Sequence, residues 1–203
     1  MRRLCLLLLL CLPWLPAAAA EAPRSLLVLG DSLSAAYGLP AGSGWVDLLQ
    51  ARLARERPGW RVVNASISGE TSHGARRRLP ALLAQHRPAL VIIELGGNDG
   101  LRGLSLAALR DNLLAMTRAA QAEGAKVLLA GMHLPPNLGP AYTQTFHATF
   151  QEVARQTGAA LLPFLLADIA TREGLMQSDG IHPTAEAQPL ILENLWPALH
   201  PLL

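Results

Sequence analysis

Short apolar runs alternate with segments that carry leucines at helical spacing along nearly the whole chain. The runs are four to seven residues long, which suits buried strands, and the segments between them are long enough to be helices. Such alternation predicts parallel strands joined by right-handed crossovers. We expect strands at 25–29, 61–67, 89–95, 126–130 and 159–162, and helices at 42–57, 72–86, 105–123, 142–156 and 184–196.

The predicted fold is a three-layer α/β/α sandwich with five parallel strands in the flavodoxin-like order 2-1-3-4-5. Residues 89–95 are almost all apolar, so this strand should be central. We expect residues 96–100 and 132–140 to be loops and residues 164–176 to be a short helix with a loop. Pro183 should open the last helix, and Pro189 should kink it.

The N-terminus has the features of a secretory signal peptide over residues 1–20. Arg2 and Arg3 precede an apolar core at 4–12, prolines follow, and residues 18–20 are alanines that suit cleavage. The apolar core is too short to span a bilayer. An alternative is lipoprotein processing at Cys11, which the bulky Leu10 disfavours. We expect export to the periplasm or the medium and one domain over residues 21–203.

Composition limits the chemistry of the remaining 183 residues. Both cysteines lie within residues 1–20, which excludes thiolate catalysis and zinc–thiolate sites from the rest. Loss of Arg2 and Arg3 leaves 15 basic and 15 acidic residues, and no basic patch suggests nucleic acid. The cluster Arg76–Arg78 is read as a solvated helix face rather than a phosphate or headgroup site. No metal or cofactor is expected, and we expect a monomer.

Three polar loops should meet at one edge of the sheet, because strand 1 lies between strands 2 and 3 in this order. Ser32 follows the first strand, Gly69 the second and Asn98 the third. A serine hydroxyl beside backbone N–H groups and an amide is the arrangement that acyl transfer requires. The simpler alternative is that Asp31 or Ser32 only caps a helix.

A base for Ser32 follows the last predicted strand. Asp179 and His182 are three residues apart with Gly180 between them, so the carboxylate can reach the imidazole Nδ1–H and leave Nε2 for the serine. His182 could instead be an ordinary residue at a helix start, with Asp179 as an N-terminal charge. The other histidines are weaker candidates: His86, His147 and His200 should be solvated on helices, whereas His73 and His133 could line a cleft.

Four sequence blocks together resemble one family. The blocks are Gly30–Ser34, Ser68–Thr71, Gly96–Asp99 and Asp179–Pro183, and they occur in this order behind a leader. The chain is similar to the SGNH hydrolases, also called GDSL esterases/lipases, and most similar to their thioesterase I / lysophospholipase / arylesterase branch. The resemblance covers about residues 24–199.

The resemblance implies a catalytic triad of Ser32, Asp179 and His182, with Ser32, Gly69 and Asn98 as the oxyanion hole. It implies a serine esterase that hydrolyses aryl esters, lysophospholipids and fatty acyl thioesters without a cofactor. Leu101, Leu104, Leu134 and Leu138 would suit an acyl tail, although a core role is equally open for each. The alternatives are a carbohydrate O-acetyl esterase with the same triad and a non-enzymatic flavodoxin-like binding module.

Overall fold

Five parallel strands form one sheet in the order β2-β1-β3-β4-β5, which confirms the predicted topology. The computed structural model describes residues 23–203, so the proposed leader at 1–20 lies outside the described residues. The strands are β1 Arg24–Gly30, β2 Trp60–Asn64, β3 Leu90–Glu94, β4 Lys126–Ala130 and β5 Ala160–Leu162.

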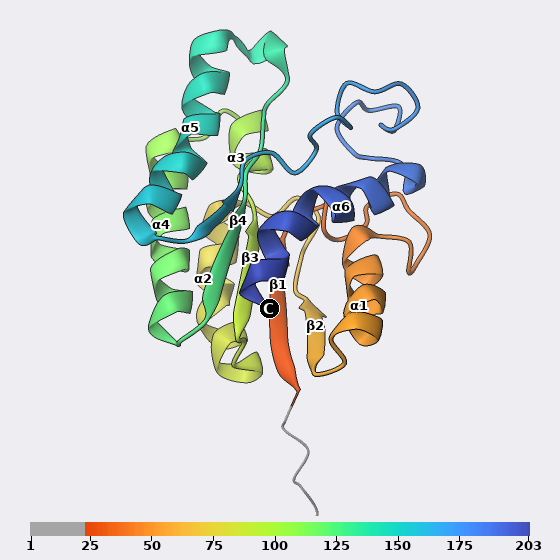
Figure 1. Ribbon diagram of the computed structural model, residues 1–203. Coiled ribbons are helices and arrows are strands. Elements are labelled where there is room, and N and C mark those ends of the chain that lie inside the picture. Colours follow the sequence, from red (N-terminus) through yellow and green to blue (C-terminus); the bar gives the residue numbers. More distant parts are fainter. Residues whose placement is uncertain (1–22) are drawn as a thin grey trace, which may run out of the picture.

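Helices cover both faces of this sheet, which gives the three layers expected (Figure 1). One face carries α1 (Trp45–Glu56) and α6 (Gln188–Leu199). The other face carries α2 (Ser72–His86), α4 (Leu106–Ala122) and α5 (Pro140–Thr157). Short 3₁₀ turns at Pro136–Leu138, Ala185–Ala187 and His200–Leu202 complete the regular structure.

The first strand supplies side chains to both layers of the core. Leu27 and Leu29 pack in the cluster under α2, α4 and α5, whereas Leu26 and Val28 pack in the cluster under α1 and α6. All four are fully buried, and burial of such a side chain contributes about 2 kcal/mol. This packing fixes the carboxyl end of β1, where the polar loop begins.

Two helices begin at a residue whose side chain caps them. The Thr71 hydroxyl accepts a hydrogen bond from the Gly74 N–H at the start of α2, and the Ser105 hydroxyl accepts one from the Ala108 N–H at the start of α4. No helix within residues 23–203 is long and apolar enough to cross a bilayer.

The structure corrects four local predictions. Pro183 does not open the last helix, because it pairs with Met176 in an isolated bridge and α6 begins only at Gln188. Residues 96–100 are not only a loop, because Gly97–Leu101 form a short helix, α3. Residues 164–176 contain turns and no helix. Pro189 does not kink a helix; it lies in the first turn of α6, where its missing N–H is not needed, after the 3₁₀ turn Ala185–Ala187.

Candidate active site

Ser32 lies immediately beyond the end of β1, in a tight turn. The Ala35 N–H donates to the Asp31 carbonyl and the Tyr37 N–H donates to the Ser32 carbonyl. Only glycine fits at position 30, because an added Cβ would lie 2.6 Å from Ser34 Oγ and 2.7 Å from Glu94 Oε2. The end of β1 and the close packing of Gly30 against Ser34 and Glu94 place Ser32, half-buried, at the sheet edge.

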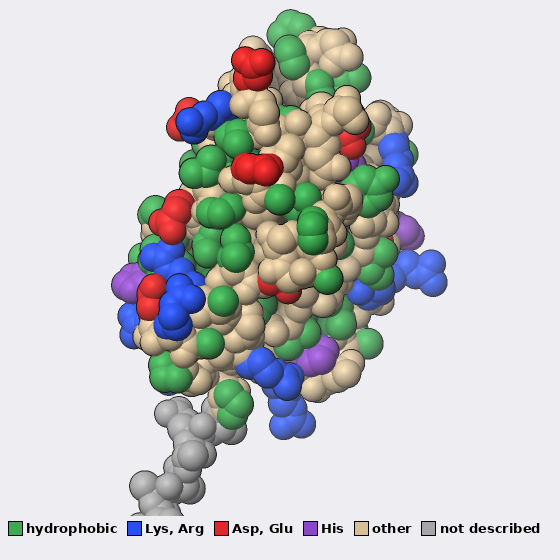
Figure 2. Space-filling view, turned by 90° about the vertical axis from the view of Figure 1, so that its right-hand side faces the viewer, with side chains coloured by type: hydrophobic (Ala, Val, Ile, Leu, Met, Phe, Trp, Pro, Cys, Tyr) green, Lys and Arg blue, Asp and Glu red, His purple; other side chains and the backbone are tan. Residues whose placement is uncertain are grey.

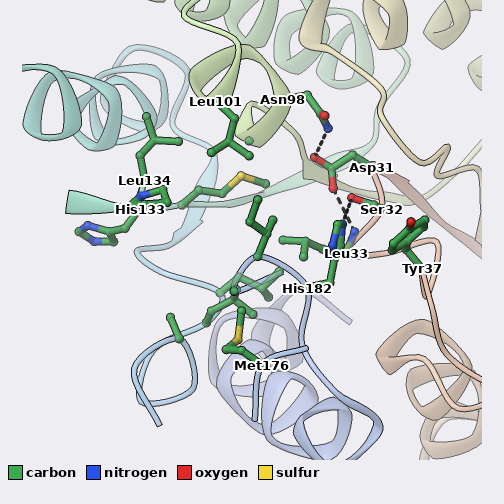
Figure 3. A pocket seen from close by; sticks show the side chains of 18 of the residues that line it. Asp31, Ser32, Leu33, Tyr37, Asn98, Leu101, His133, Leu134, Met176 and His182 are labelled. Atoms are coloured by element: carbon green, nitrogen blue, oxygen red, sulfur yellow. Dashed lines mark hydrogen bonds between the residues drawn. The ribbon is translucent and has the colours of Figure 1, made fainter. Parts of the chain in front are cut away.

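The structure joins Ser32, His182 and Asp179 in one chain of hydrogen bonds. Figure 3 shows the Ser32 and His182 side chains of this chain. Ser32 Oγ is 2.9 Å from His182 Nε2, and His182 Nδ1 is 2.6 Å from Asp179 Oδ2. Asp179 also accepts from the backbone N–H groups of Ile181 and His182 through Oδ1. In this arrangement Nδ1 carries the proton and Nε2 accepts from the serine hydroxyl.

Asp179 is held in its ionised form by the turn that contains it. The hydrogen bond from the His182 N–H, followed by the contacts with the His182 side chain and the Ile181 N–H, lowers the pKa of Asp179 to about 2. Because the carboxylate stays charged at all ordinary pH values, it keeps the imidazole in one tautomer.

The turn with Asp179 and His182 is tied to the serine turn through Gln177. The Gln177 amide Nε2 donates to the Tyr37 and Pro183 carbonyls, and its backbone N–H donates to the His182 carbonyl. The Tyr37 ring lies 4.6 Å from the imidazole, measured between ring centroids. These contacts hold the imidazole over Ser32.

Three N–H donors lie at the same edge of the sheet as the serine hydroxyl. Within the described residues, the backbone N–H groups of Ser32 and Gly69 make no hydrogen bond, so both are free for a ligand oxygen. Asn98 Nδ2 donates one hydrogen to Asp31 Oδ2 at 3.1 Å and keeps the second for the cleft. The structure thus brings Gly69 and Asn98 to the same sheet edge as Ser32, from the loops after β2 and β3.

Asn98 is carried by the short helix α3, which Asp99 anchors to α2. The buried carboxylate of Asp99 accepts from the Ser72 N–H at 2.8 Å and from the Ser72 hydroxyl at 2.6 Å. Asn112 of α4 donates to that same hydroxyl. These hydrogen bonds therefore hold in place the backbone that carries the Asn98 amide.

Two buried carboxyl groups lie beneath the serine turn. Burial raises the pKa of Asp31 to about 6, against the hydrogen bonds from Leu33 and Asn98 that lower it. Burial also raises the pKa of Glu94 well above its ordinary value, and the neighbouring Asp31 raises it further. Glu94 accepts from the Ser34 hydroxyl at 2.6 Å and from the Asp31 N–H at 3.3 Å.

An apolar cleft of about 510 Å³ opens beside the serine hydroxyl (Figure 3). Its polar end contains Ser32, Asn98 and His182. The apolar side chains that line it are Leu33, Leu101, Met132, Leu134, Pro135, Pro136, Phe164, Leu165, Leu166, Met176 and Ile181. A cleft with one polar end and apolar walls suits a chain of methylene groups attached to a carbonyl.

The model of the GDSL-like lipase/acylhydrolase family matches residues 28–189 of this chain. This range includes every residue of the site described above. The chain belongs to that family.

Two curated relatives of this GDSL-family chain are similar over nearly its whole length. Esterase TesA of Pseudomonas aeruginosa (strain PAO1) is 57% identical, with 98% of each chain covered. Thioesterase 1/protease 1/lysophospholipase L1 of Escherichia coli (strain K12) is 42% identical, with 91% of this chain and 87% of the relative covered.

A solved structure is similar as well. The crystal structure of the psychrotrophic esterase EstA from Pseudoalteromonas sp., inhibited by monoethylphosphonate, is 46% identical. The match covers 88% of this chain and 97% of that one, with a TM-score of 0.83.

The other histidines considered in the sequence differ in how close they lie to the GDSL-family site. His133 lines the cleft, as expected, whereas His73 is exposed on α2 and does not. His147 is not a solvated residue: it is half-buried, and its ring stacks on His133 at 3.8 Å. His86 ends α2, and the exposed His200 contacts Arg57.

Some predicted surface and lining residues also differ from expectation. Leu101 and Leu134 line the cleft, but Leu104 and Leu138 are exposed outside it. In the Arg76–Arg78 cluster, Arg76 donates to Asn112 and Arg78 donates to Glu70 and to the Ala65 carbonyl, so only part of the cluster is a solvated face.

Sequence reasoning missed Glu94 and Arg102 of this GDSL-family site. The sequence did contain an indication for Glu94. It is a charged residue at the end of an apolar run, and such a residue needs a partner when it is buried. Arg102 is four residues after Asn98, a spacing that brings side chains together only on a helix, and a helix was not expected there.

Proposed function

We propose that this chain is a serine esterase that hydrolyses acyl esters and thioesters through an acyl-enzyme on Ser32. The observation that supports this most directly is the 2.9 Å hydrogen bond between Ser32 Oγ and His182 Nε2, at the end of an apolar cleft. The hydrolase activity agrees with the relatives named esterase and thioesterase 1/lysophospholipase L1.

In the first half-reaction, His182 Nε2 takes the Ser32 hydroxyl proton as Oγ attacks the acyl carbonyl carbon. The carbonyl oxygen becomes an oxyanion, which the N–H groups of Ser32 and Gly69 and the Asn98 amide stabilise. His182 then protonates the leaving alcohol or thiol as its bond to the acyl carbon breaks. Asp179 stabilises the imidazolium throughout.

In the second half-reaction, His182 deprotonates a water molecule that attacks the acyl carbon of the Ser32 ester. The same donors stabilise the second oxyanion, and the serine oxygen leaves with the proton from His182. The products are the free acid and the regenerated serine, so the reaction needs no cofactor.

The apolar cleft favours substrates with a fatty acyl or aryl group, such as aryl esters, lysophospholipids and fatty acyl thioesters. A carbohydrate O-acetyl esterase would need polar groups for a sugar, whereas most of the surface that lines the cleft is apolar. A binding module without catalysis would have no need for the hydrogen-bonded chain of Ser32, His182 and Asp179.

The test of this proposal is hydrolysis of p-nitrophenyl butyrate by the wild type and by Ser32→Ala. We expect the substitution to reduce kcat by at least about 1,000-fold and to abolish covalent labelling by a fluorophosphonate, with an unchanged far-UV circular dichroism spectrum. The matched control is Ser43→Ala, since Ser43 is at an exposed turn away from the cleft. Retained hydrolysis by Ser32→Ala would contradict the assignment.

We also propose that residues 1–20 are removed on export, which would place the mature enzyme in the periplasm or the medium as a monomer. The basic, apolar and alanine segments at 2–20 support this. Mass spectrometry of the exported protein should give an N-terminus at Glu21. An N-terminus at Met1 or Cys11 would overturn it.

A further inference from the structure

An exposed arginine contacts two of the three residues that supply oxyanion donors. Arg102 follows α3 directly, and its Nη2 donates to the Gly69 carbonyl at 3.1 Å and to Asn98 Oδ1 at 3.2 Å. One guanidinium nitrogen carries two hydrogens, so it can make both bonds at once. Arg102 thus connects the loop after β2 to the helix after β3.

The contact with Asn98 determines which way its amide faces. Asn98 Oδ1 accepts from Arg102 on one side, and Asn98 Nδ2 donates to Asp31 Oδ2 on the other. A flipped amide would place its NH₂ against the guanidinium and its oxygen against the carboxyl, and both contacts would be repulsive. The guanidinium and Asp31 therefore hold the second Nδ2 hydrogen toward the cleft.

The contact with Gly69 fixes the other donor loop. Gly69 has φ +79°, a conformation that only glycine adopts readily and that the rest of the chain must hold in place. A Cβ at this position would lie 3.4 Å from Arg102 Nη2, which shows how closely the guanidinium covers the loop. The bond from Arg102 to the Gly69 carbonyl limits movement of the residue whose own N–H makes no hydrogen bond within the described residues.

The arginine is itself held by α3. Its backbone N–H donates to the Asn98 carbonyl at 3.2 Å, so one residue binds Asn98 through both its main chain and its side chain. The guanidinium also places a permanent positive charge next to the amide that would meet the developing oxyanion. An oxyanion site stabilises the transition state chiefly because its donors are already oriented before the reaction.

We propose that Arg102 is a positioning residue that holds the Asn98 amide and the Gly69 loop ready to bind the oxyanion. This inference rests on the proposed acyl transfer at Ser32. Arg102 acts through Asn98 and Gly69 and touches no reacting atom, so its effect should fall on kcat and on transition-state binding rather than on ground-state binding.

The experiment compares Arg102→Met, Arg102→Lys and the control Arg77→Met, with Arg77 exposed on α2 outside the cleft. With the uncharged substrate p-nitrophenyl butyrate, we expect Arg102→Met to lower kcat about tenfold with KM within twofold, less than the roughly 100- to 1,000-fold cost of losing a donor outright. Arg102→Lys, which keeps the charge but not the double hydrogen bond, should lose about threefold. Arg77→Met should match the wild type.

A second measurement separates positioning from a general loss of structure. The affinity for a trifluoromethyl ketone, which forms an oxyanion on Ser32, should weaken in Arg102→Met by the same factor as kcat/KM. The midpoint of thermal unfolding should be unchanged. If Arg102→Met does not fold, the comparison of Arg102→Lys with the wild type provides the same test.

Two results would overturn the inference. One is a kcat of Arg102→Met and Arg102→Lys within twofold of the wild type. The other is a loss confined to KM and to phosphate-bearing substrates such as lysophospholipids, which would mean that Arg102 binds substrate phosphate instead. Failure of the proposed function is a separate outcome, because the wild type itself would then neither hydrolyse the ester nor be labelled by the fluorophosphonate.

Discussion

At the scale of single residues, Asp31 contacts both the serine turn and Asn98. Its Oδ1 accepts from the Leu33 N–H at 3.0 Å within a turn, and no helix begins there, so the helix cap considered for Asp31 is absent. Its Oδ2 accepts from the Asn98 amide and so belongs to the candidate oxyanion site as well. Two oxygens on one carboxyl allow both contacts. The sequence could not show the second, because the partner is 67 residues away.

Burial of Asp31 predicts a pH-dependent contribution to stability. Its pKa is raised from 3.8 to about 6, so the folded state binds the proton more tightly than the unfolded state does. The contribution is therefore fully present below about pH 4 and is lost as the pH rises through 6, by about 3 kcal/mol in total.

The measurement is urea unfolding of the wild type and Asp31→Asn at pH 4 and pH 7.5. The free energy of unfolding of the wild type minus that of Asp31→Asn should fall by about 2.4 kcal/mol between the two pH values, because at pH 4 the unfolded carboxyl is already partly ionised. The subtraction removes the contributions of titrating groups that do not interact with Asp31. A difference that does not vary with pH would contradict the raised pKa.

At the scale of elements, the short helix α3 and the start of α2 form one unit around Asp99. Glycine-rich residues at 96–100 indicated only a loop, because five residues with no apolar periodicity give no helical signal. The helix exists because the buried Asp99 carboxylate binds the N–H and hydroxyl of Ser72. Long-range hydrogen bonds of this kind are not visible in local sequence.

Asp99→Ala should destabilise the fold by roughly 2–4 kcal/mol, because the buried N–H and hydroxyl of Ser72 would lose their acceptor. It should also lower kcat, because Asn98 would lose its fixed backbone. Urea unfolding and esterase assays measure the two effects. Asp111→Ala is the matched control, since Asp111 is exposed and pairs with Arg110; its cost should stay within about 0.5 kcal/mol. A cost below about 1 kcal/mol for Asp99→Ala would show that the contact is unimportant.

At the scale of the whole molecule, the sheet and its order could be predicted because each strand is a separate apolar run and each crossover is a helix. The predicted strand order implies that Ser32, Gly69 and Asn98 lie at one edge of the sheet, because each follows one of three neighbouring strands. Only part of the cleft could be predicted, namely Leu101, His133 and Leu134. The wall from residues 164–176 could not, because that segment has no periodic pattern.

The candidate site consists of two parts with different supports. Ser32, Gly69 and Asn98 follow strands of the sheet, whereas Asp179 and His182 lie in a turn-rich segment. That segment is held by few contacts, among them the Met176–Pro183 bridge and the hydrogen bonds of Gln177. Segments with few buried contacts open at a lower free energy than the core does.

We therefore expect esterase activity to be lost on heating before the sheet unfolds. The midpoint of activity loss, assayed at temperature, should lie a few degrees below the midpoint measured by far-UV circular dichroism. Gln177→Ala should widen this gap, because it removes side-chain hydrogen bonds to Tyr37 and Pro183 and leaves the sheet intact. Coincident midpoints for the wild type and Gln177→Ala would argue that the segment and the sheet unfold together.

The apolar cleft has a consequence for the end of the catalytic cycle. Hydrolysis turns the acyl group into an acid whose tail is still in contact with the same leucine, methionine and phenylalanine side chains. Each added methylene that is buried in the cleft retains this product by up to about 0.8 kcal/mol. For long chains, escape of the fatty acid into water would then be slower than the chemistry, so turnover would depend on a surface or carrier that accepts it.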